Sequence, residues 1–328
     1  MKEEVLSVLK SNPGVYISGQ SLCEKLNVSR TAIWKYINAL KEDGYEIESA
    51  SKKGYRLVSS PDLLTGDEVI PFLDTKCIGR NYFHFDSLES TNTKAKELAS
   101  KPGLDGAVVV SEEQTTGKGR LGRNWVSPKH RGIWMSIILK PDIEPSSVPK
   151  IVHIAAAAVV LAMQELGIKA SVKWPNDIIL NGKKVCGILT EMSGEINHID
   201  FVVVGIGINA NLGQEDIPQE IAEKASSLYV ETGSAVDRKC LAAKVLNHFE
   251  TLYLDFLKTG TIDASVKICR DNSILLGRDI RIIARSKERK ARAVDISIDG
   301  ELIVQLEDGR IEPISSGEVS VRALNGYI

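Results

Sequence analysis

The spacing of hydrophobic positions changes twice along the chain and divides it into three zones. Residues 1 to about 58 carry apolar residues at helical spacing and then in alternation, residues from about 62 to 270 mix helical and strand patterns, and residues from about 271 onward show only short alternating strands. Ser59-Ser60-Pro61-Asp62 marks a hinge, since proline after polar residues resists both helix and strand. We therefore predict an α+β protein with three domains, 1–60, 61–270 and 271–328.

The first zone predicts a winged helix-turn-helix. Apolar residues recur at spacings of three and four in three stretches, and Ser18 and Ser29 stand where they can cap the second and third helices. Alternating apolar residues then predict a hairpin with Lys52-Lys53 at its tip. The positions expected to face inward are Val5, Leu6 and Leu9, then Leu22, Cys23 and Leu26, then Ile33, Ile37 and Leu40, and in the hairpin Tyr45, Ile47, Tyr55 and Leu57.

The outer face of the third predicted helix suits nucleic acid. Two short helices joined by a tight turn, the second with an exposed cationic face, match the geometry that enters a major groove, and a lysine-tipped wing can touch phosphates. The alternative is a small protein-interaction module, because exposed lysines and arginines are usually only solvated. The position of Trp34 beside Arg30 and Lys35 favours a DNA-binding face over a protein-interaction module. The predicted DNA-binding residues are Ser29, Arg30, Thr31, Trp34, Lys35, Lys52 and Lys53.

A basic, glycine-rich segment follows a predicted strand at 107–111. Gly117-x-Gly119-x-x-Gly122 satisfies the dinucleotide-binding string, but no helix pattern follows it, so we reject that interpretation. No acidic residue occurs between Glu113 and Asp142. A flexible cationic loop of this kind suits a polyphosphate, and the alternatives are a solvated loop or a second DNA contact. The cations of the segment are Lys118, Arg120, Arg123, Lys129, Arg131 and Lys140.

Two further motifs open regular elements in the central zone. Ser90-Thr91-Asn92 precedes a short helix, and N-capping is its simplest interpretation. Lys173-Trp174-Pro175-Asn176-Asp177 opens a strand although proline and asparagine are poor strand residues. Asn181-Gly182 then predicts a hairpin. Because adjacent strand residues point to opposite faces, only one of Lys183 and Lys184 can face a site beneath the sheet.

A continuous apolar strand at 202–209 carries Gly205 and Gly207, which allow a ligand or another backbone to approach closely. Its glycines also satisfy the dinucleotide-binding string, but a polar loop rather than a helix follows the strand, so we again reject that interpretation. No Walker phosphate-binding loop occurs in the sequence.

Composition adds limits to the partners that the chain can have. The formal net charge of −2 means that a nucleic acid or membrane must be met by a local patch. The five cysteines are far apart and odd in number, which favours reduced thiols. The charged N-terminus predicts no signal peptide, and the apolar run at 154–163 is about half the length that a bilayer span needs. We therefore expect a cytoplasmic protein without a membrane partner.

Taken together, these motifs resemble the biotin protein ligases, and the winged helix makes the chain similar to the bifunctional type that also represses the biotin operon. The resemblance covers essentially the whole chain. It rests most on the motifs at 117–123 and 173–177, with support from Gly207-Ile208-Asn209 and Gly317-Glu318-Val319-Ser320-Val321-Arg322. It implies a central mixed sheet with helices, like that of class II aminoacyl-tRNA synthetases, and a C-terminal SH3-like β-barrel.

The resemblance also assigns roles to residues. It implies that the ureido ring of biotin meets Ser90, Thr91, Asn92 and Gln114, and that the biotin tail meets Lys118, Gly119 and Arg120. Lys184 would lie between the biotin carboxylate and the α-phosphate, and Asp177 would orient Arg120, which makes these three the catalytic residues. The implied ATP-binding residues are Arg123, Trp125, Lys173, Asn176 and Asn209.

The implied reaction uses ATP, Mg²⁺ and biotin to form biotinyl-5′-AMP, and then biotinylates a lysine of a carrier domain from acetyl-CoA carboxylase or pyruvate carboxylase. Mg²⁺ would arrive with ATP rather than at a protein metal site. Bound biotinyl-AMP would favour a homodimer that reads operator DNA. Two alternatives stay open: a non-enzymatic regulator that only senses a ligand, and a lipoate-type ligase with the same adenylation chemistry.

Overall fold

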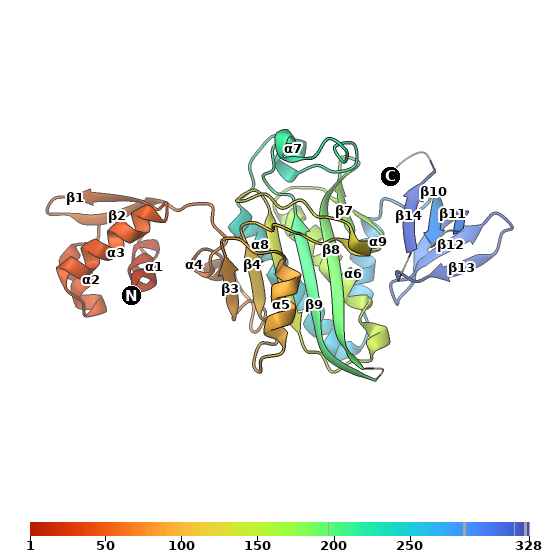
Figure 1. The fold of residues 1–328 in the computed structure, drawn as a ribbon, viewed down its shortest axis with the longest axis horizontal. Coiled ribbons are helices and arrows are strands. Elements are labelled where there is room, and N and C mark those ends of the chain that lie inside the picture. Colours follow the sequence, from red (N-terminus) through yellow and green to blue (C-terminus); the bar gives the residue numbers. More distant parts are fainter. Residues whose placement is uncertain (196, 285–286, 318, 325–326, 328) are drawn as a thin grey trace. The chain divides into compact units, whose positions relative to one another are not determined.

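The computed structural model describes residues 1–195, 197–284, 287–317, 319–324 and 327. These residues form two compact units, Met1–Leu63 and Leu64–Ile328. The first unit holds three helices and a hairpin in the predicted order (Figure 1, red to orange). Their bounds are α1 Lys2–Lys10, α2 Gly19–Leu26, α3 Arg30–Glu42, β1 Glu46–Ala50 and β2 Gly54–Ser59.

The core of the first unit follows the apolar spacing of its sequence. The hydroxyl groups of Ser18 and Ser29 accept hydrogen bonds from the N–H groups of Ser21 and Ala32, so both serines cap their helices as predicted. Leu22, the inner face of α3 and the start of the hairpin are buried together, whereas Cys23 and Leu26 are only partly buried. This confirms the helix-turn-helix prediction.

The second unit is built on a seven-stranded mixed sheet with the order β3-β4-β5-β9-β8-β7-β6. The β3–β4 pair is parallel, and the other neighbouring pairs of the sheet are antiparallel. The strands are β3 Tyr82–Phe85, β4 Val108–Ser111, β5 Ile133–Leu139, β6 Ser171–Lys173, β7 Asp177–Leu180, β8 Lys183–Glu195 and β9 His198–Ile208. The predicted Asn181-Gly182 hairpin joins β7 to β8, with both turn residues at positive φ.

Helices cover both faces of this sheet. Val108 and Val110 pack into the core that contains α6 and α8, whereas Val109, between them, packs against α5, because side chains alternate along a strand. The helices are α4 Gly66–Val69, α5 Thr91–Ala99, α6 Lys150–Glu165, α7 Leu228–Thr232, α8 Arg238–Thr259 and α9 Asp263–Asp271, with short 3₁₀ turns at Ile70–Phe72, Arg120–Gly122, Pro145–Ser147 and Gln214–Asp216.

One helical stretch, Pro145–Glu165, is long and apolar enough to cross a membrane by length and composition, but 67% of its most apolar window is buried inside the structure. A helix that is apolar on all sides is expected at the centre of a large core. Packing in the second unit therefore accounts for its composition.

The C-terminal strands form a separate antiparallel sheet within the second unit. Its order is β13-β12-β11-β10-β14, and it lies in the zone for which the sequence predicts only short alternating strands. The indole of Trp174 donates a hydrogen bond of 2.9 Å to the carbonyl of Gly300, which ties this sheet to the motif at 173–177. The strands are β10 Asp279–Ala284, β11 Lys287–Ile296, β12 Leu302–Leu306, β13 Ile311–Ile314 and β14 Val319–Ala323.

Candidate active site

Two adjoining cavities lie beside the β4–β5 loop: the smaller is lined by residues of α5, β8 and β9, and the larger by residues of the motif at 173–177 and of β14. The larger cavity measures about 230 Å³ and the smaller about 50 Å³. The residues that line both of them are Gly119, Arg120, Trp125, Asn176 and Lys184. The structure therefore brings Arg120 and Lys184, which come from different parts of the sequence, into one cleft.

The β4–β5 loop folds back on itself beside the cleft. The N–H of Trp125 donates to the carbonyl of Gly117 at 2.8 Å, and the N–H of Gly119 donates to the carbonyl of Arg123 at 2.7 Å. A Cβ at position 117 would lie 2.3 Å from the carbonyl oxygen of Trp125. Close packing, rather than the flexibility expected from the sequence, is therefore the reason that a glycine stands at 117.

Arg120 is held firmly by the polypeptide. Its guanidinium donates to the side-chain oxygen of Asn176 at 2.9 Å and to the carbonyls of Ser316 and Gly317, both at 2.8 Å. Burial lowers the pKa of Arg120 although nearby Asp177 acts to raise it. Asn176 supplies the side-chain hydrogen bond to Arg120, and the neighbouring Asp177 acts on Arg120 through its charge. Glu318 of the quoted C-terminal motif lies outside the described residues.

Asp177 instead pairs with Lys184. The amine of Lys184 lies 2.5 Å from one carboxylate oxygen of Asp177, and the hydroxyl of Tyr327 donates to the other at 2.6 Å. Lys183 pairs across the hairpin with Leu180 and lines neither cavity, which confirms that only one of the two lysines faces the site.

Lys173 is a buried amine in the larger cavity. It is 3% exposed, and its amine lies 3.2 Å from the ring centroid of Tyr327. Burial and the neighbouring cations, Lys184 first among them, lower the pKa of Lys173 to about 7, although Asp177 acts to raise it. Tyr327 is a site residue that the sequence did not reveal, because an isolated tyrosine near the C-terminus carries no periodic or motif signal.

Glycines on β8 and β9 make room for the indole of Trp125. A Cβ at Gly207 would lie 2.7 Å from the indole nitrogen, and a Cβ at Gly187 would lie 2.9 Å from the ring. Among the described residues, the indole N–H of Trp125 and the side-chain oxygen of Asn209 are buried without a hydrogen-bond partner. Two unpaired polar groups on the larger cavity indicate a ligand that can pair with them.

The smaller cavity is lined by Ser90, Thr91, Asn92 and Gln114. The Gln114 side-chain oxygen accepts from the N–H of Thr91 at 2.8 Å, and the amide of Asn92 donates to Glu191 at 2.7 Å. Ser90 occupies the cap position of α5 without a capping hydrogen bond from its side chain, so the N-capping interpretation is wrong.

A second pair of contacts fixes Asn92, and neither was expected from the sequence. The hydroxyl of Ser136, a buried residue of β5, donates to the Asn92 oxygen at 2.6 Å. A Cβ at Gly205 would lie 2.2 Å from that oxygen, so the glycine on β9 leaves room for it. These contacts come from strands far apart in the sequence.

The six cations of the loop segment separate into two groups. Lys118 lines the smaller cavity, Arg123 lines the larger one, and Arg120 lines both. The other three contact groups outside these cavities or at the rim of the larger one: Lys129 pairs with Asp86 at 2.6 Å, Arg131 pairs with Asp216 at 3.5 Å, and Lys140 donates to the carbonyl of Lys101 at 3.0 Å. Only half of the expected cationic loop can therefore serve the cleft.

The predicted nucleic-acid face of the first unit is exposed. The side chain of Trp34 is 60% exposed, and its neighbours on α3 are exposed with it. A hollow of about 510 Å³ lies between α3 and the wing and is lined by Arg30 and Lys52, among others. The seven predicted DNA-binding residues, Ser29, Arg30, Thr31, Trp34, Lys35, Lys52 and Lys53, are all exposed.

Three family models match the chain. The model described as "Biotin/lipoate A/B protein ligase family" matches residues 84–209, "HTH domain" matches residues 2–56, and "Biotin protein ligase C terminal domain" matches residues 275–322. The "Bifunctional ligase/repressor BirA" of Bacillus subtilis is 36% identical over 98% of both chains, and that of Escherichia coli is 28% identical over 94% of both. The structure of a biotin protein ligase from Aquifex aeolicus in complex with biotin and ATP matches with a TM-score of 0.65 at 31% identity, over 74% of this chain and 99% of that chain.

Proposed function

The chain belongs to the family of bifunctional biotin protein ligases and repressors, and from this premise we propose how its cleft and its winged helix divide the work. The second unit joins biotin to ATP and transfers biotin to a lysine of a carrier domain. The first unit reads operator DNA. The convergence of Arg120 and Lys184 on one cleft is the observation that carries the enzymatic part.

In the first step, the carboxylate of biotin attacks the α-phosphate of ATP, biotinyl-5′-AMP forms and pyrophosphate leaves. The biotin carboxylate and the α-phosphate are both negatively charged, so cations must stabilise both of them as they approach each other. Lys184 and Arg120 serve the reacting carboxylate and α-phosphate. Lys173 and Arg123 serve the remaining phosphates, which arrive with Mg²⁺. Asp177 acts as a positioning group, because it holds the amine of Lys184.

The two cavities accept the two halves of the adenylate. The smaller cavity takes the ureido ring against Ser90, Thr91, Asn92 and Gln114, with Lys118 and Gly119 along the tail. The larger cavity takes the adenosine against Trp125 and Asn209. The unpaired indole N–H and amide oxygen of these two residues support this assignment, because an adenine ring offers both acceptors and a donor.

In the second step, the amine of the carrier lysine attacks the carbonyl of biotinyl-AMP, and AMP leaves with the bond electrons. The mixed anhydride must be kept from water until then. The folded β4–β5 loop, whose residues line both cavities, supports this role. No side-chain nucleophile of the protein is needed in either step.

The direct test is incubation of the protein with ATP, biotin and a biotin carrier domain of acetyl-CoA carboxylase or pyruvate carboxylase, followed by probing with streptavidin. We expect biotinylated carrier that depends on ATP. A protein that binds biotin but labels no carrier would favour the ligand-sensing regulator. A lipoate-type ligase is the second alternative. The dithiolane ring of lipoate offers no hydrogen-bonding groups to Thr91 and Asn92, so lipoate should compete poorly with biotin.

The repressor role rests on the exposed face of α3 and the wing. We propose that biotinyl-AMP promotes a homodimer, whose two winged helices match a two-fold operator. Deletion of residues 1–60 should abolish operator binding. Operator affinity that survived the deletion would assign DNA reading to another part of the chain.

We also propose the finer features of the fold and the location. The five antiparallel strands of the C-terminal sheet support an SH3-like barrel, and the mixed central sheet supports a relationship to class II aminoacyl-tRNA synthetases. The five free cysteines support a cytoplasmic location.

A further inference from the structure

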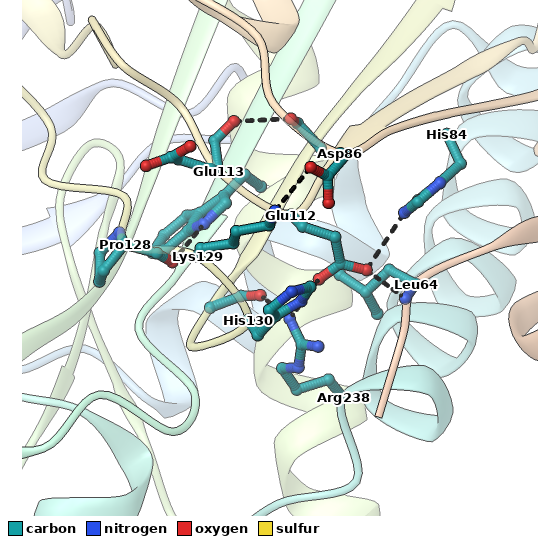
Figure 2. Close-up of polar contacts among 12 residues, drawn as sticks. Leu64, His84, Asp86, Glu112, Glu113, Pro128, Lys129, His130 and Arg238 are labelled. Carbon is teal, nitrogen blue, oxygen red and sulfur yellow. Dashed lines mark hydrogen bonds and ion pairs between the residues drawn. The ribbon is translucent and has the colours of Figure 1, made fainter. Parts of the chain in front are cut away.

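The base of the β4–β5 loop is closed by a contact between its two ends. Glu112 directly follows β4, and His130 stands shortly before β5. The N–H of His130 donates to the carbonyl of Glu112 at 3.1 Å. The side chains meet as well, with 3.2 Å between the His130 ring nitrogen Nδ1 and a carboxylate oxygen of Glu112 (Figure 2).

Glu112 is a rigid anchor because the protein surrounds it completely. The same oxygen that faces His130 lies 3.0 Å from the guanidinium of Arg238, and both Glu112 and Arg238 are 0% exposed. The other oxygen accepts the N–H of Leu64 at 2.6 Å and lies 3.2 Å from His84. Burial acts to raise the pKa of Glu112, but His84, Arg238 and the Leu64 N–H together lower it to about 2, so the group is a carboxylate.

Arg238 strengthens the returning arm of the loop too. Its guanidinium donates to the carbonyl of Gly132 at 2.9 Å, next to β5. The departing arm at Glu112 and the returning arm at His130 and Gly132 thus share one buried ion pair (Figure 2). A buried carboxylate that lost such partners would be strongly disfavoured, so the arrangement is fixed.

Several of the residues that the proposed reaction uses lie between these two ends. Gln114, Lys118, Arg120 and Trp125 all lie between Glu112 and His130, and they line one or both cavities. A wider loop base would loosen the segment that carries Gln114, Lys118 and Trp125, while Arg120 keeps its contacts to Asn176, Ser316 and Gly317. It would do so without removing any group that touches a ligand.

We propose that Glu112 and His130 form a clasp that positions this loop, and that the clasp sets how long biotinyl-5′-AMP stays in the cleft. The inference rests on the proposed function. Both are positioning residues, because neither lines a cavity.

The chain offers a matched control beside the clasp. Lys129 forms an ion pair of 2.6 Å with Asp86, but the side chains are 41% and 70% exposed, and an exposed pair of this kind contributes little. The side chain of His130 is itself 44% exposed, so its replacement leaves the buried ion pair in place. His130 has a φ of 59°, which asparagine and glycine tolerate better than alanine.

The experiment measures the release of labelled biotinyl-5′-AMP from the full-length protein after dilution into unlabelled ligand. His130→Ala should release it roughly tenfold faster, as expected for the loss of a hydrogen bond to a charged group. His130→Gly should behave like His130→Ala, since it removes the ring without backbone strain. His130→Asn, whose amide can still donate to Glu112, should restore most of the retention. Lys129→Ala should match the wild type, and the melting temperature should be similar in all variants.

Equal release from His130→Ala, Lys129→Ala and the wild type would overturn the clasp alone. A wild-type protein that formed no adenylate at all would overturn the proposed function together with the clasp. If Lys129→Ala also released biotinyl-5′-AMP faster, retention of the adenylate would depend on the general order of the loop rather than on the Glu112–His130 contact. That result would overturn the clasp as well.

Discussion

In the cleft of the second unit the polypeptide holds the positive side chains, whereas on α3 and the wing of the first unit they stand in solvent. Arg120 donates to four groups of the protein and Lys184 pairs with Asp177, but Lys35 and Lys52 are exposed. Fixed cations cost no reorganisation when charge develops in a reaction. Solvent-exposed cations are sufficient for binding DNA, because DNA supplies many phosphates and the release of its counterions drives binding.

The two regions also differ in what their backbones require. The cleft needs glycines where Trp125 and Asn92 press against β8 and β9. The face of α3 needs only a regular helix with a capped start, whereas the wing needs a glycine at 54, where a Cβ would lie 2.0 Å from the carbonyl oxygen of Ile17. A cleft of fixed cations should therefore be sensitive to single changes, and the exposed face should respond gradually.

The largest effect is expected from Lys184→Ala. Removal of a cation that acts on the reacting anions should lower the rate of biotinyl-AMP formation by roughly 10²–10³-fold. Lys183→Ala is the matched control, because its side chain lines neither cavity, and its rate should stay near that of the wild type. Rapid-quench measurement of the adenylate separates the two. Equal rates for both variants would remove Lys184 from the chemistry.

Gly207→Ala should come next. The added methyl would lie 2.7 Å from the Trp125 indole nitrogen and would force the ring out of place. Overpacking of this kind costs about 1–3 kcal/mol, which corresponds to roughly 5–150-fold weaker ATP binding. Gly19→Ala in the first unit is the control, since its methyl would meet only Tyr55 at 3.8 Å. Calorimetric titration with ATP measures both, and unchanged affinity in Gly207→Ala would contradict the assignment of Trp125.

The pH dependence of ATP binding tests the buried amine in the cleft. The pKa of Lys173 is lowered to about 7, so the amine loses its charge as the pH rises through 7, and phosphate binding should weaken by at most about tenfold per pH unit above that value. The same shift makes folding stability rise between pH 7 and the ordinary lysine range, because the unfolded chain then binds the proton that the folded chain has lost. Lys173→Arg, which stays charged, should flatten the binding profile. A profile that Lys173→Arg leaves unchanged would assign the dependence to another group.

The smallest effect is expected at the wing. Lys52→Ala should weaken operator binding only a few-fold and lower the slope of log affinity against log salt by about 1. Biotinylation by the same variant should be unchanged. Fluorescence anisotropy at several salt concentrations measures the slope. A loss of carrier biotinylation in Lys52→Ala would contradict the assignment of DNA binding to the first unit and of biotinylation to the second.

Local signals were enough to predict the first unit. Ser18 and Ser29 cap their helices, and Ile33, Ile37 and Leu40 are buried, because a helix start and an apolar face depend on residues a few positions apart. The two-residue turn at Asn181-Gly182 was predictable for the same reason. In the cleft, local motifs placed Arg120 in a basic, glycine-rich segment and Lys184 beside a hairpin turn, and the resemblance to the biotin protein ligases then singled out these two cations.

The contacts that orient those residues were not predictable. The contact between Arg120 and Asn176 joins positions 56 residues apart, and Tyr327 reaches Asp177 across 150 positions of the sequence. The Glu112–Arg238 pair joins positions 126 residues apart. Such partners depend on how strands and loops pack in three dimensions, and a single sequence contains no periodicity that records them.

A double-mutant cycle on biotinyl-AMP formation with Arg120→Ala, Lys184→Ala and the double variant tests directly whether the two cations act on the same pair of anions. If both cations act together on the same pair of anions, the double variant should be far faster than the product of the two single losses predicts, with a coupling of about 1 kcal/mol or more. Single-turnover rates give the three losses relative to the wild type. Losses that simply multiply would show that the two residues act independently, and the shared cleft would then not be the basis of the reaction.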